Sequence, residues 1–226
     1  MYEFNCFVPT TTANASLFYI YNSNLWCKNM SLNYIIENNR YGVKIPTTKY
    51  NHGYLPVYER LFEPYKKHIN LLEIGILGGS SLALWQEFFE SYTITGVEIL
   101  PDFMPLADVQ AYDMPWIQNL FECPNINLLW NIDATQPVTD KVKSLGEFDI
   151  IIDDSVATIK LALEIFKNHW PLLKVGGTYI FEDLFRRHTI DAGKKIVNSI
   201  LPKGSFQIDA IEIENQKRIL FTVTKM

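Results

Sequence analysis

Short apolar runs alternate with longer helical patterns along the chain from about Tyr54 onward. The apolar runs predict five strands, at residues 70–74, 93–98, 126–132, 148–153 and 177–182. Between them, hydrophobic residues recur at three- and four-residue spacing, which predicts helices over 80–91 and 159–170. This alternation is typical of an open, mostly parallel sheet with crossover helices on both faces.

Residues 191–226 predict an end to the sheet that differs from the parallel strands before it. A helix is predicted over 191–201, and two apolar runs follow, 206–213 and 218–224, joined by the polar residues 214–217. A short polar connection between two strands favours an antiparallel hairpin. The predicted fold is therefore α/β, a mostly parallel seven-stranded Rossmann-like sheet with a C-terminal antiparallel hairpin. This is the sheet layout of class I methyltransferases, whereas a dehydrogenase domain normally ends in a parallel sixth strand.

The N-terminal segment carries no clear period and is rich in Asn and Thr. We predict an N-terminal arm or cap over 1–46 and a single domain over 47–226. A helix is expected over 31–39, because Ser31 can serve as its N-cap and Gly42 can stop it. The N-terminal segment could be a packed extension, a lid or a dimer arm, and all three remain open. Whether the protein forms a homo-oligomer is left open as well.

Composition excludes several classes of protein. The 226 residues are 48% hydrophobic and 20% charged, which excludes a disordered or low-complexity chain. With 20 Lys and Arg against 25 Asp and Glu, the net charge is −5, which argues against nucleic acid as a partner. The three cysteines form no CxxC motif, which favours reduced thiols and a cytoplasmic location. No segment resembles a signal peptide or a membrane span, so no membrane partner is expected.

A carboxylate stands at the end of each of the five predicted strands: Glu73, Glu98, Asp133, Asp153 and Glu182. Open parallel sheets bind ligands outside the carboxyl ends of their strands. Carboxylates at that edge can accept hydrogen bonds from ribose hydroxyls, attract a cationic ligand, hold a metal ion, or cap the following helices.

A glycine turn follows the first predicted strand, with the sequence Gly75-Ile76-Leu77-Gly78-Gly79-Ser80. Glycines let a ligand approach the backbone closely, and the start of the next helix supplies N–H donors. The turn lacks the Gly-Lys-Ser/Thr ending of a P-loop and is a loose variant of GxGxxG. Together with Glu98 after the second strand, it predicts a cofactor that contains adenosine.

Two pairs of adjacent carboxylates end the fourth and fifth predicted strands. Asp153 and Asp154 follow one apolar run, and Glu182 and Asp183 follow the next. Neighbouring strands would bring Asp154, Glu182 and Asp183 to one edge, an all-oxygen set suited to Mg²⁺ or a similar hard cation. From these residues alone, metal binding and helix capping both remain open.

Five segments resemble, in order, the macrocin and mycinamicin type of sugar O-methyltransferase, a group that also takes in proteins labelled cephalosporin hydroxylase-like. The segments are 49–54, 58–62, 71–89, 148–154 and 176–184. The resemblance implies a class I methyltransferase fold, S-adenosylmethionine as methyl donor and a divalent metal, Mg²⁺, that grips a sugar acceptor.

The resemblance also implies roles for individual residues. The cofactor would be lined by His52, Tyr54, Glu73, Gly75, Gly78, Gly79, Ser80, Glu98, Asp133 and Asp153. Asp154, Glu182 and Asp183 would be the metal ligands. The family continues its Asp-Asp pair with Gly-Ser-His, whose His is the proposed general base, whereas Ala157 stands at that position here. Asp154 and His188 are then the remaining candidates for a catalytic base.

The expected function is metal-assisted O-methylation of a sugar or a glycosylated small molecule. Metal coordination lowers the pKa of a hydroxyl and can partly replace a dedicated base. The missing histidine keeps a different acceptor, such as an amine, open as an alternative. A nicotinamide-dependent oxidoreductase is disfavoured because no Tyr-x-x-x-Lys pair follows the fourth strand, and an inactive binding protein on the same sheet is a further alternative.

Overall fold

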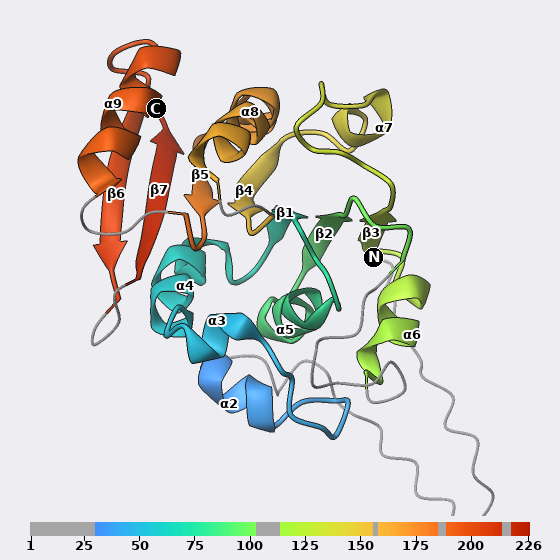
Figure 1. Cartoon of the computed structure of the whole chain (residues 1–226). Helices are drawn as coiled ribbons and strands as arrows, with labels where there is room; N and C mark the ends of the chain where they lie inside the picture. The colour runs from blue at the N-terminus through green and yellow to red at the C-terminus, as the bar shows by residue number, and fades with distance from the viewer. Residues whose placement is uncertain (1–29, 103–113, 156–157, 185–188, 214–217) are drawn as a thin grey trace, which may run out of the picture.

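The computed structural model describes residues 30–102, 114–155, 158–184, 189–213 and 218–226, and one seven-stranded sheet runs through them (Figure 1). The strand order across the sheet is β3-β2-β1-β4-β5-β7-β6. The strands are β1 (Ile69–Ile74), β2 (Tyr92–Val97), β3 (Ile126–Leu129), β4 (Phe148–Asp153), β5 (Leu173–Phe181), β6 (Phe206–Glu212) and β7 (Ile219–Lys225).

Strands β1 to β5 are mutually parallel, and β7 runs antiparallel to both β5 and β6. The predicted C-terminal hairpin is therefore confirmed. It forms one edge of the sheet beside β5, and the strand order reverses at the β1/β4 boundary. The fold class predicted from the sequence is confirmed, and open sheets of this kind bind ligands beside that reversal.

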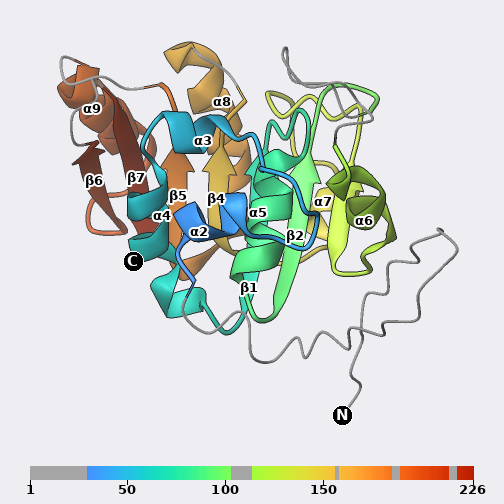
Figure 2. The same ribbon diagram turned by 90° about the horizontal axis from the view of Figure 1, so that it is seen from below.

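Helices cover both faces of the sheet (Figures 1 and 2). One face carries α2 (Leu32–Glu37), α3 (Thr48–Asn51), α4 (Leu55–Phe62), α5 (Ser80–Phe88) and α6 (Trp116–Glu122). The other carries α7 (Asp140–Lys143), α8 (Ile159–His169) and α9 (Ile190–Ile200), and two short 3₁₀ helices span Glu63–Tyr65 and Trp170–Leu172. Each face has its own buried hydrophobic cluster, so the sheet is buried on both sides.

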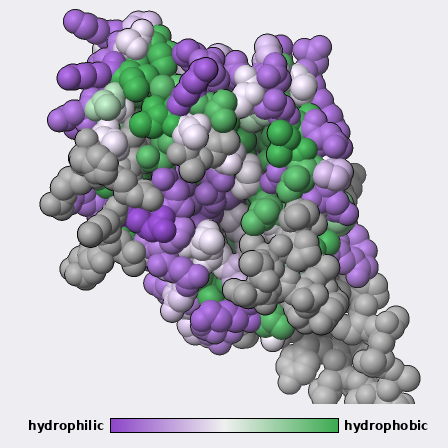
Figure 3. Space-filling model, viewed as in Figure 1, coloured by the Kyte–Doolittle hydropathy of each residue, from purple (hydrophilic) through white to green (hydrophobic). Residues whose placement is uncertain are grey.

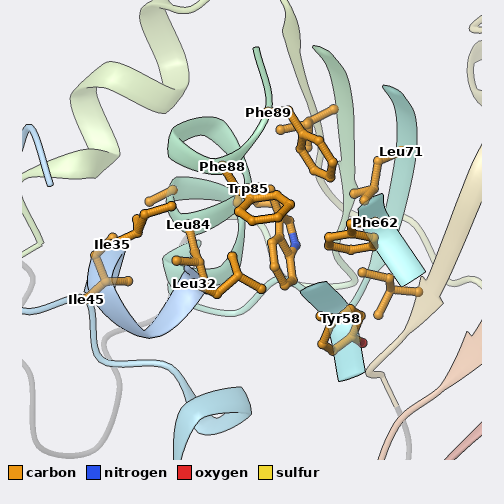
Figure 4. Close-up of a cluster of buried hydrophobic side chains, with 14 of the residues drawn as sticks. Leu32, Ile35, Ile45, Tyr58, Phe62, Leu71, Leu84, Trp85, Phe88 and Phe89 are labelled. Carbon is orange, nitrogen blue, oxygen red and sulfur yellow. The ribbon is translucent and has the colours of Figure 1, made fainter. Parts of the chain in front are cut away.

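The helix expected near the start of the chain is present as α2. The Ser31 side chain accepts a hydrogen bond from Tyr34 N, as predicted for its N-cap. Leu32 and Ile35 are buried against α4 and α5 in the same cluster as the sheet (Figure 4). This part of the predicted arm therefore packs on the core, while residues 1–29 lie outside the described residues and the division at residue 46 stays a prediction.

Aromatic side chains form the centre of the cluster on the α2–α6 face (Figure 4). Phe62 lies edge-on to Trp85, with ring centroids 4.9 Å apart, and Tyr58 lies 5.1 Å from the same ring. Such pairs add stability beyond the area they bury. Because Tyr58 and Phe62 belong to α4, this cluster fixes α4 against α5, and with it the preceding α3.

The surface shown in Figure 3 carries both hydrophilic and hydrophobic residues, and hydrophilic residues separate the hydrophobic groups from one another. Among the described residues, no helix has the length and apolar character needed to cross a lipid bilayer.

Candidate functional site

The carboxyl ends of β1, β4 and β5 meet at one edge of the sheet, as expected for parallel strands. Ile74 is in register with Asp153, and Asp153 with Phe181. Asp154 N donates to Ile74 O at 3.0 Å, and Glu182 N donates to Asp153 O at 3.0 Å. The adjacent carboxylates that end β4 and β5 are therefore placed side by side by the backbone ladder itself.

A lysine to which the sequence had assigned no role lies among these carboxylates. Lys49 belongs to α3, which sits over the carboxyl ends of β4 and β5 in Figure 2. Its ammonium nitrogen is 2.7 Å from Glu182 Oε1, 2.9 Å from Asp154 Oδ2 and 3.2 Å from Glu73 Oε1. Only 1% of the Lys49 side chain is exposed. Burial alone would lower the pKa of Lys49, but the three carboxylates raise it well above its usual value, so the side chain is cationic.

Glu182 is fully buried and uses one of its two oxygens. Oε1 accepts hydrogen bonds from Lys49 Nζ and from the Tyr58 hydroxyl. Oε2 is buried and has no hydrogen-bond partner within the described residues. Burial, together with the nearby charge of Asp154, raises the pKa of Glu182 to about 8. The unpartnered oxygen is thus a place where a cation would be favoured.

Asp183 faces a different set of partners. It accepts hydrogen bonds from the Tyr54 hydroxyl at 2.6 Å and from the guanidinium of Arg218, which stands just before β7. His52 Nδ1 lies 3.2 Å from its other oxygen, and burial lowers the pKa of His52. Asp183 also has a left-handed backbone, with φ of 54°. The predicted cofactor residues His52 and Tyr54 therefore contact a predicted metal ligand, and Arg218 is a site residue that sequence reasoning missed.

Asp153 lies beneath the edge, with 4% of its surface exposed. Its carboxylate accepts hydrogen bonds from the hydroxyls of Ser155 at 2.6 Å and Tyr179 at 3.0 Å. Burial raises the pKa of Asp153 to about 6 despite these hydrogen bonds. Its predicted place beside the sulfonium stays a prediction.

The glycine turn after β1 packs directly on the segment after β4. A Cβ added at Gly75, where φ is 86°, would lie 2.7 Å from Asp154 O, so only glycine fits there. Gly79, with φ of 70°, precedes α5, and Gly78 O accepts a hydrogen bond from Trp116 Nε1 at 2.9 Å. Ser80 begins α5 and is buried. The turn thus adjoins the carboxylate edge.

Glu98 binds the glycine turn through its side chain. Oε2 accepts hydrogen bonds from Ile76 N and Leu77 N, both at 3.0 Å. Oε1 accepts from Ile99 N at 2.8 Å and Leu100 N at 3.3 Å. A carboxylate offers about four acceptor positions, so backbone donors occupy all of them here. A ribose hydroxyl would therefore compete with the turn for Glu98.

The remaining predicted residues are placed as follows. Asp133, just after β3, accepts hydrogen bonds from Thr135 N and its hydroxyl, and these bonds lower the pKa of Asp133. Glu73 is completely buried, and Trp85 Nε1 donates to its Oε2 at 2.8 Å. Leu77 and Ile99 leave apolar side chains 44% and 61% exposed beside Glu98. His188 and Ala157 lie outside the described residues.

Asp154, Glu182 and Asp183 are the predicted ligands of a divalent metal. Among the described residues, no group of three His, Cys, Asp or Glu side chains is arranged to hold an ion. Asp154 and Glu182 nevertheless share the Lys49 ammonium, and each has a second oxygen that Lys49 does not use. Mg²⁺ usually keeps several waters and binds through one or two carboxylates plus its substrate. These two carboxylates therefore fit such an ion, whereas the third predicted ligand, Asp183, is engaged by Tyr54 and Arg218.

Curated proteins similar in sequence share one activity. The chain is 27% identical over 143 residues to the 8-demethyl-8-alpha-L-rhamnosyl tetracenomycin-C 2'-O-methyltransferase of Streptomyces olivaceus, an alignment that covers 59% of this chain. It is 29% identical over 142 residues to the demethylmacrocin O-methyltransferase of Streptomyces fradiae, covering 59% of this chain, and 28% identical over 149 residues to the mycinamicin VI 2''-O-methyltransferase of Micromonospora griseorubida, covering 62%.

The homologues of this chain are sugar O-methyltransferases. The resemblance drawn from the motifs is thereby confirmed. The alignments span about a third of the length of these relatives, 33%, 32% and 33% respectively. No family model matches the chain.

Solved structures of methyltransferases share the fold. The MycE methyltransferase of the mycinamycin pathway, in complex with Mg and SAH, superposes with a TM-score of 0.61 at 20% identity, over 88% of this chain and 55% of that one. A putative rRNA methylase from Clostridium thermocellum gives a TM-score of 0.52 at 12% identity, over 76% of this chain and 95% of that one. The chain has the class I methyltransferase fold.

Proposed function

We propose that this protein is an S-adenosylmethionine-dependent O-methyltransferase that acts, with a divalent metal, on a hydroxyl of a sugar or glycosylated small molecule. The observation that carries the proposal is the contact between the glycine turn and the carboxylate edge, where a Cβ at Gly75 would meet Asp154 O at 2.7 Å. A cofactor held at the turn and an acceptor held at Asp154 would therefore be neighbours.

The turn side of the site suits the methyl donor. Gly78 and Gly79 allow a ligand to approach the backbone just before α5, which begins at Ser80, while Gly75 lets the turn pack on Asp154. The exposed side chains of Leu77 and Ile99 offer an apolar surface for a flat base beside the turn. The carboxylates nearby favour the positive charge of a sulfonium over a neutral ligand.

The β4 and β5 side of the site suits the acceptor. Asp154 and Glu182 would hold the divalent metal, and the third predicted ligand, Asp183, stays a prediction. When bound, the metal supplies a lowered pKa at a coordinated sugar hydroxyl. Methyl transfer from a sulfonium is an in-line displacement, so these residues contribute chiefly by orienting the acceptor oxygen. Asp154, 25% exposed and adjoining the turn, is the candidate group to accept the hydroxyl proton, with His188 as the other candidate.

The test combines binding with turnover. We expect calorimetry to detect binding of S-adenosylhomocysteine, and mass spectrometry to detect methyl transfer from S-adenosylmethionine to members of a panel of rhamnosides and other deoxysugar glycosides. An excess of chelator is expected to abolish transfer while binding of S-adenosylhomocysteine persists. Full transfer in chelator would remove the metal from the proposal, and absence of cofactor binding would remove the methyltransferase assignment.

The replacement of the family histidine by Ala157 favours one second candidate, a class I methyltransferase with an acceptor other than a sugar hydroxyl, such as an amine. An amine acceptor needs no base of the kind that a hydroxyl needs. Including amino sugars and simple amines in the same panel separates the two. We also propose a cytoplasmic location, on the cysteine pattern, and small-molecule rather than nucleic-acid substrates, on the net charge of −5.

A further inference from the structure

Lys49 is a cation enclosed by the carboxylates that would hold the metal. Its side chain is 1% exposed, and it contacts three carboxylates that lie on β1, after β4 and after β5. A lysine buried this deeply is kept only where partners compensate the loss of hydration. Because the ammonium lies between the three carboxylates, it can determine where each of them points.

Lys49 donates to only one carboxyl oxygen of Asp154 and one of Glu182. It takes Oδ2 of Asp154 and Oε1 of Glu182. Within the described residues, Oε2 of Glu182 is left buried without a hydrogen-bond partner, and Asp154 is left with its other oxygen on a partly exposed side chain. The ammonium therefore holds one half of each carboxylate and leaves the other half for a second cation.

The formal charge of the cluster also leaves room for a second cation beside Lys49. With all four carboxyl groups ionised, as a bound cation would keep them, the described residues of the cluster carry four negative and two positive charges, from Glu73, Asp154, Glu182 and Asp183 with Lys49 and Arg218. Two negative charges are left over, which one divalent ion would balance.

Glu73 anchors the ammonium from the opposite side. It is completely buried, lies 3.2 Å from Lys49 Nζ through Oε1, and is held by Trp85 Nε1 through Oε2. Both Glu73 oxygens thus face donor groups of the protein itself. Because Trp85 lies in the aromatic cluster of α4 and α5, the position of the ammonium is fixed by the hydrophobic core.

We propose that Lys49 is a positioning residue of the divalent-cation site, which fixes Asp154 and Glu182 so that Oδ1 and Oε2 are presented together to the ion. This inference rests on the proposed function, because it assumes that Asp154 and Glu182 bind a metal. A merely neutralising charge would act in the opposite direction, since removing a cation near a metal strengthens the attraction between the metal and its carboxylates.

The sign of the effect on metal affinity therefore separates the two roles. Binding of Mn²⁺ to the full chain is measured by electron paramagnetic resonance, and binding of S-adenosylhomocysteine by calorimetry. Lys49→Met is expected to weaken Mn²⁺ binding at least tenfold, because the two carboxylates then repel each other and separate. Lys49→Arg, which keeps the charge but not the compact three-way contact, is expected to weaken it about threefold.

Lys174→Met is the matched control. Lys174 also pairs with a carboxylate, Asp149, at 2.7 Å, but at the other end of the sheet from the site. We expect this variant to bind Mn²⁺ like the wild type, and all three variants to bind S-adenosylhomocysteine within twofold of the wild type.

Mn²⁺ binding by Lys49→Met that equals or exceeds that of the wild type overturns the positioning role and leaves the proposed function intact. If Lys49→Met does not fold, wild-type affinity in Lys49→Arg overturns it instead. A wild-type protein that binds S-adenosylhomocysteine but no Mn²⁺ overturns this inference together with the metal part of the proposed function, and its methyltransferase part survives.

Discussion

Replacing Glu98 by Gln tests whether this carboxylate is a structural clamp of the glycine turn or a ligand of the cofactor. Its two oxygens accept four backbone hydrogen bonds, two from the turn and two from the segment after β2. A glutamine amide keeps one accepting oxygen and replaces the other by a donor. Two of the four N–H groups then lose their acceptor and face a donor instead.

These hydrogen bonds set the expected loss in the free energy of unfolding. A hydrogen bond to a charged group contributes about 1.5 kcal/mol or more, and Glu98 is buried, with 7% of its surface exposed. Losing two such bonds is expected to lower the free energy of unfolding by about 3 kcal/mol. For a domain of this size, that corresponds to a fall in Tm of roughly 6–12 °C.

The assay is urea unfolding followed by circular dichroism, with binding of S-adenosylhomocysteine measured on the same preparations. Glu147→Gln, at an exposed position, is the control and is expected to lie within about 0.5 kcal/mol of the wild type. If Glu98→Gln unfolds like the wild type but binds the cofactor far more weakly, Glu98 serves the ribose rather than the turn, and the reasoning from the four backbone bonds is refuted.

Three further predictions concern the glycine turn, a buried histidine and helix α2. Gly75→Ala is expected to destabilise the protein by about 2 kcal/mol or more and to abolish cofactor binding, because a Cβ there meets Asp154 O at 2.7 Å; wild-type unfolding in urea would contradict this. His169 is buried and Nδ1 lies 2.9 Å from Ile165 O, and burial lowers the pKa of His169 below 6.5. Below about pH 6.5 the unfolded chain therefore binds a proton at His169 that the native state does not bind. The free energy of unfolding then falls by at most about 1.4 kcal/mol per pH unit. Measured from pH 7.5 to 5.5, the Tm of His169→Gln should fall less steeply than the Tm of the wild type. Ile35→Ala should cost about 2–4 kcal/mol, since Ile35 is 1% exposed in the core; a loss below 1 kcal/mol would show that α2 contributes little to it.

Some element boundaries followed from local pattern and others did not. The strand over 148–153 was predicted to the residue, because its apolar run is bounded by carboxylates on one side and a charged loop on the other. The strand predicted over 126–132 ends at Leu129, with Asn131 in a left-handed conformation at φ of 58°. The strand predicted over 177–182 begins at Leu173, because a register irregularity against β4 accommodates Gly176 and Gly177 inside it.

The sequence by itself determined the alternation of strands and helices, the C-terminal hairpin, the glycine turn and the carboxylates at the strand ends, because each is written in residues close together along the chain. Only the tertiary structure decided how those carboxylates are used. Lys49 meets Asp154 and Glu182 across 105 and 133 residues, and Arg218 meets Asp183 across 35. Whether a carboxylate faces a lysine, a backbone turn or a ligand depends on charges and donors brought within about 3 Å by folding, and no local pattern records that distance.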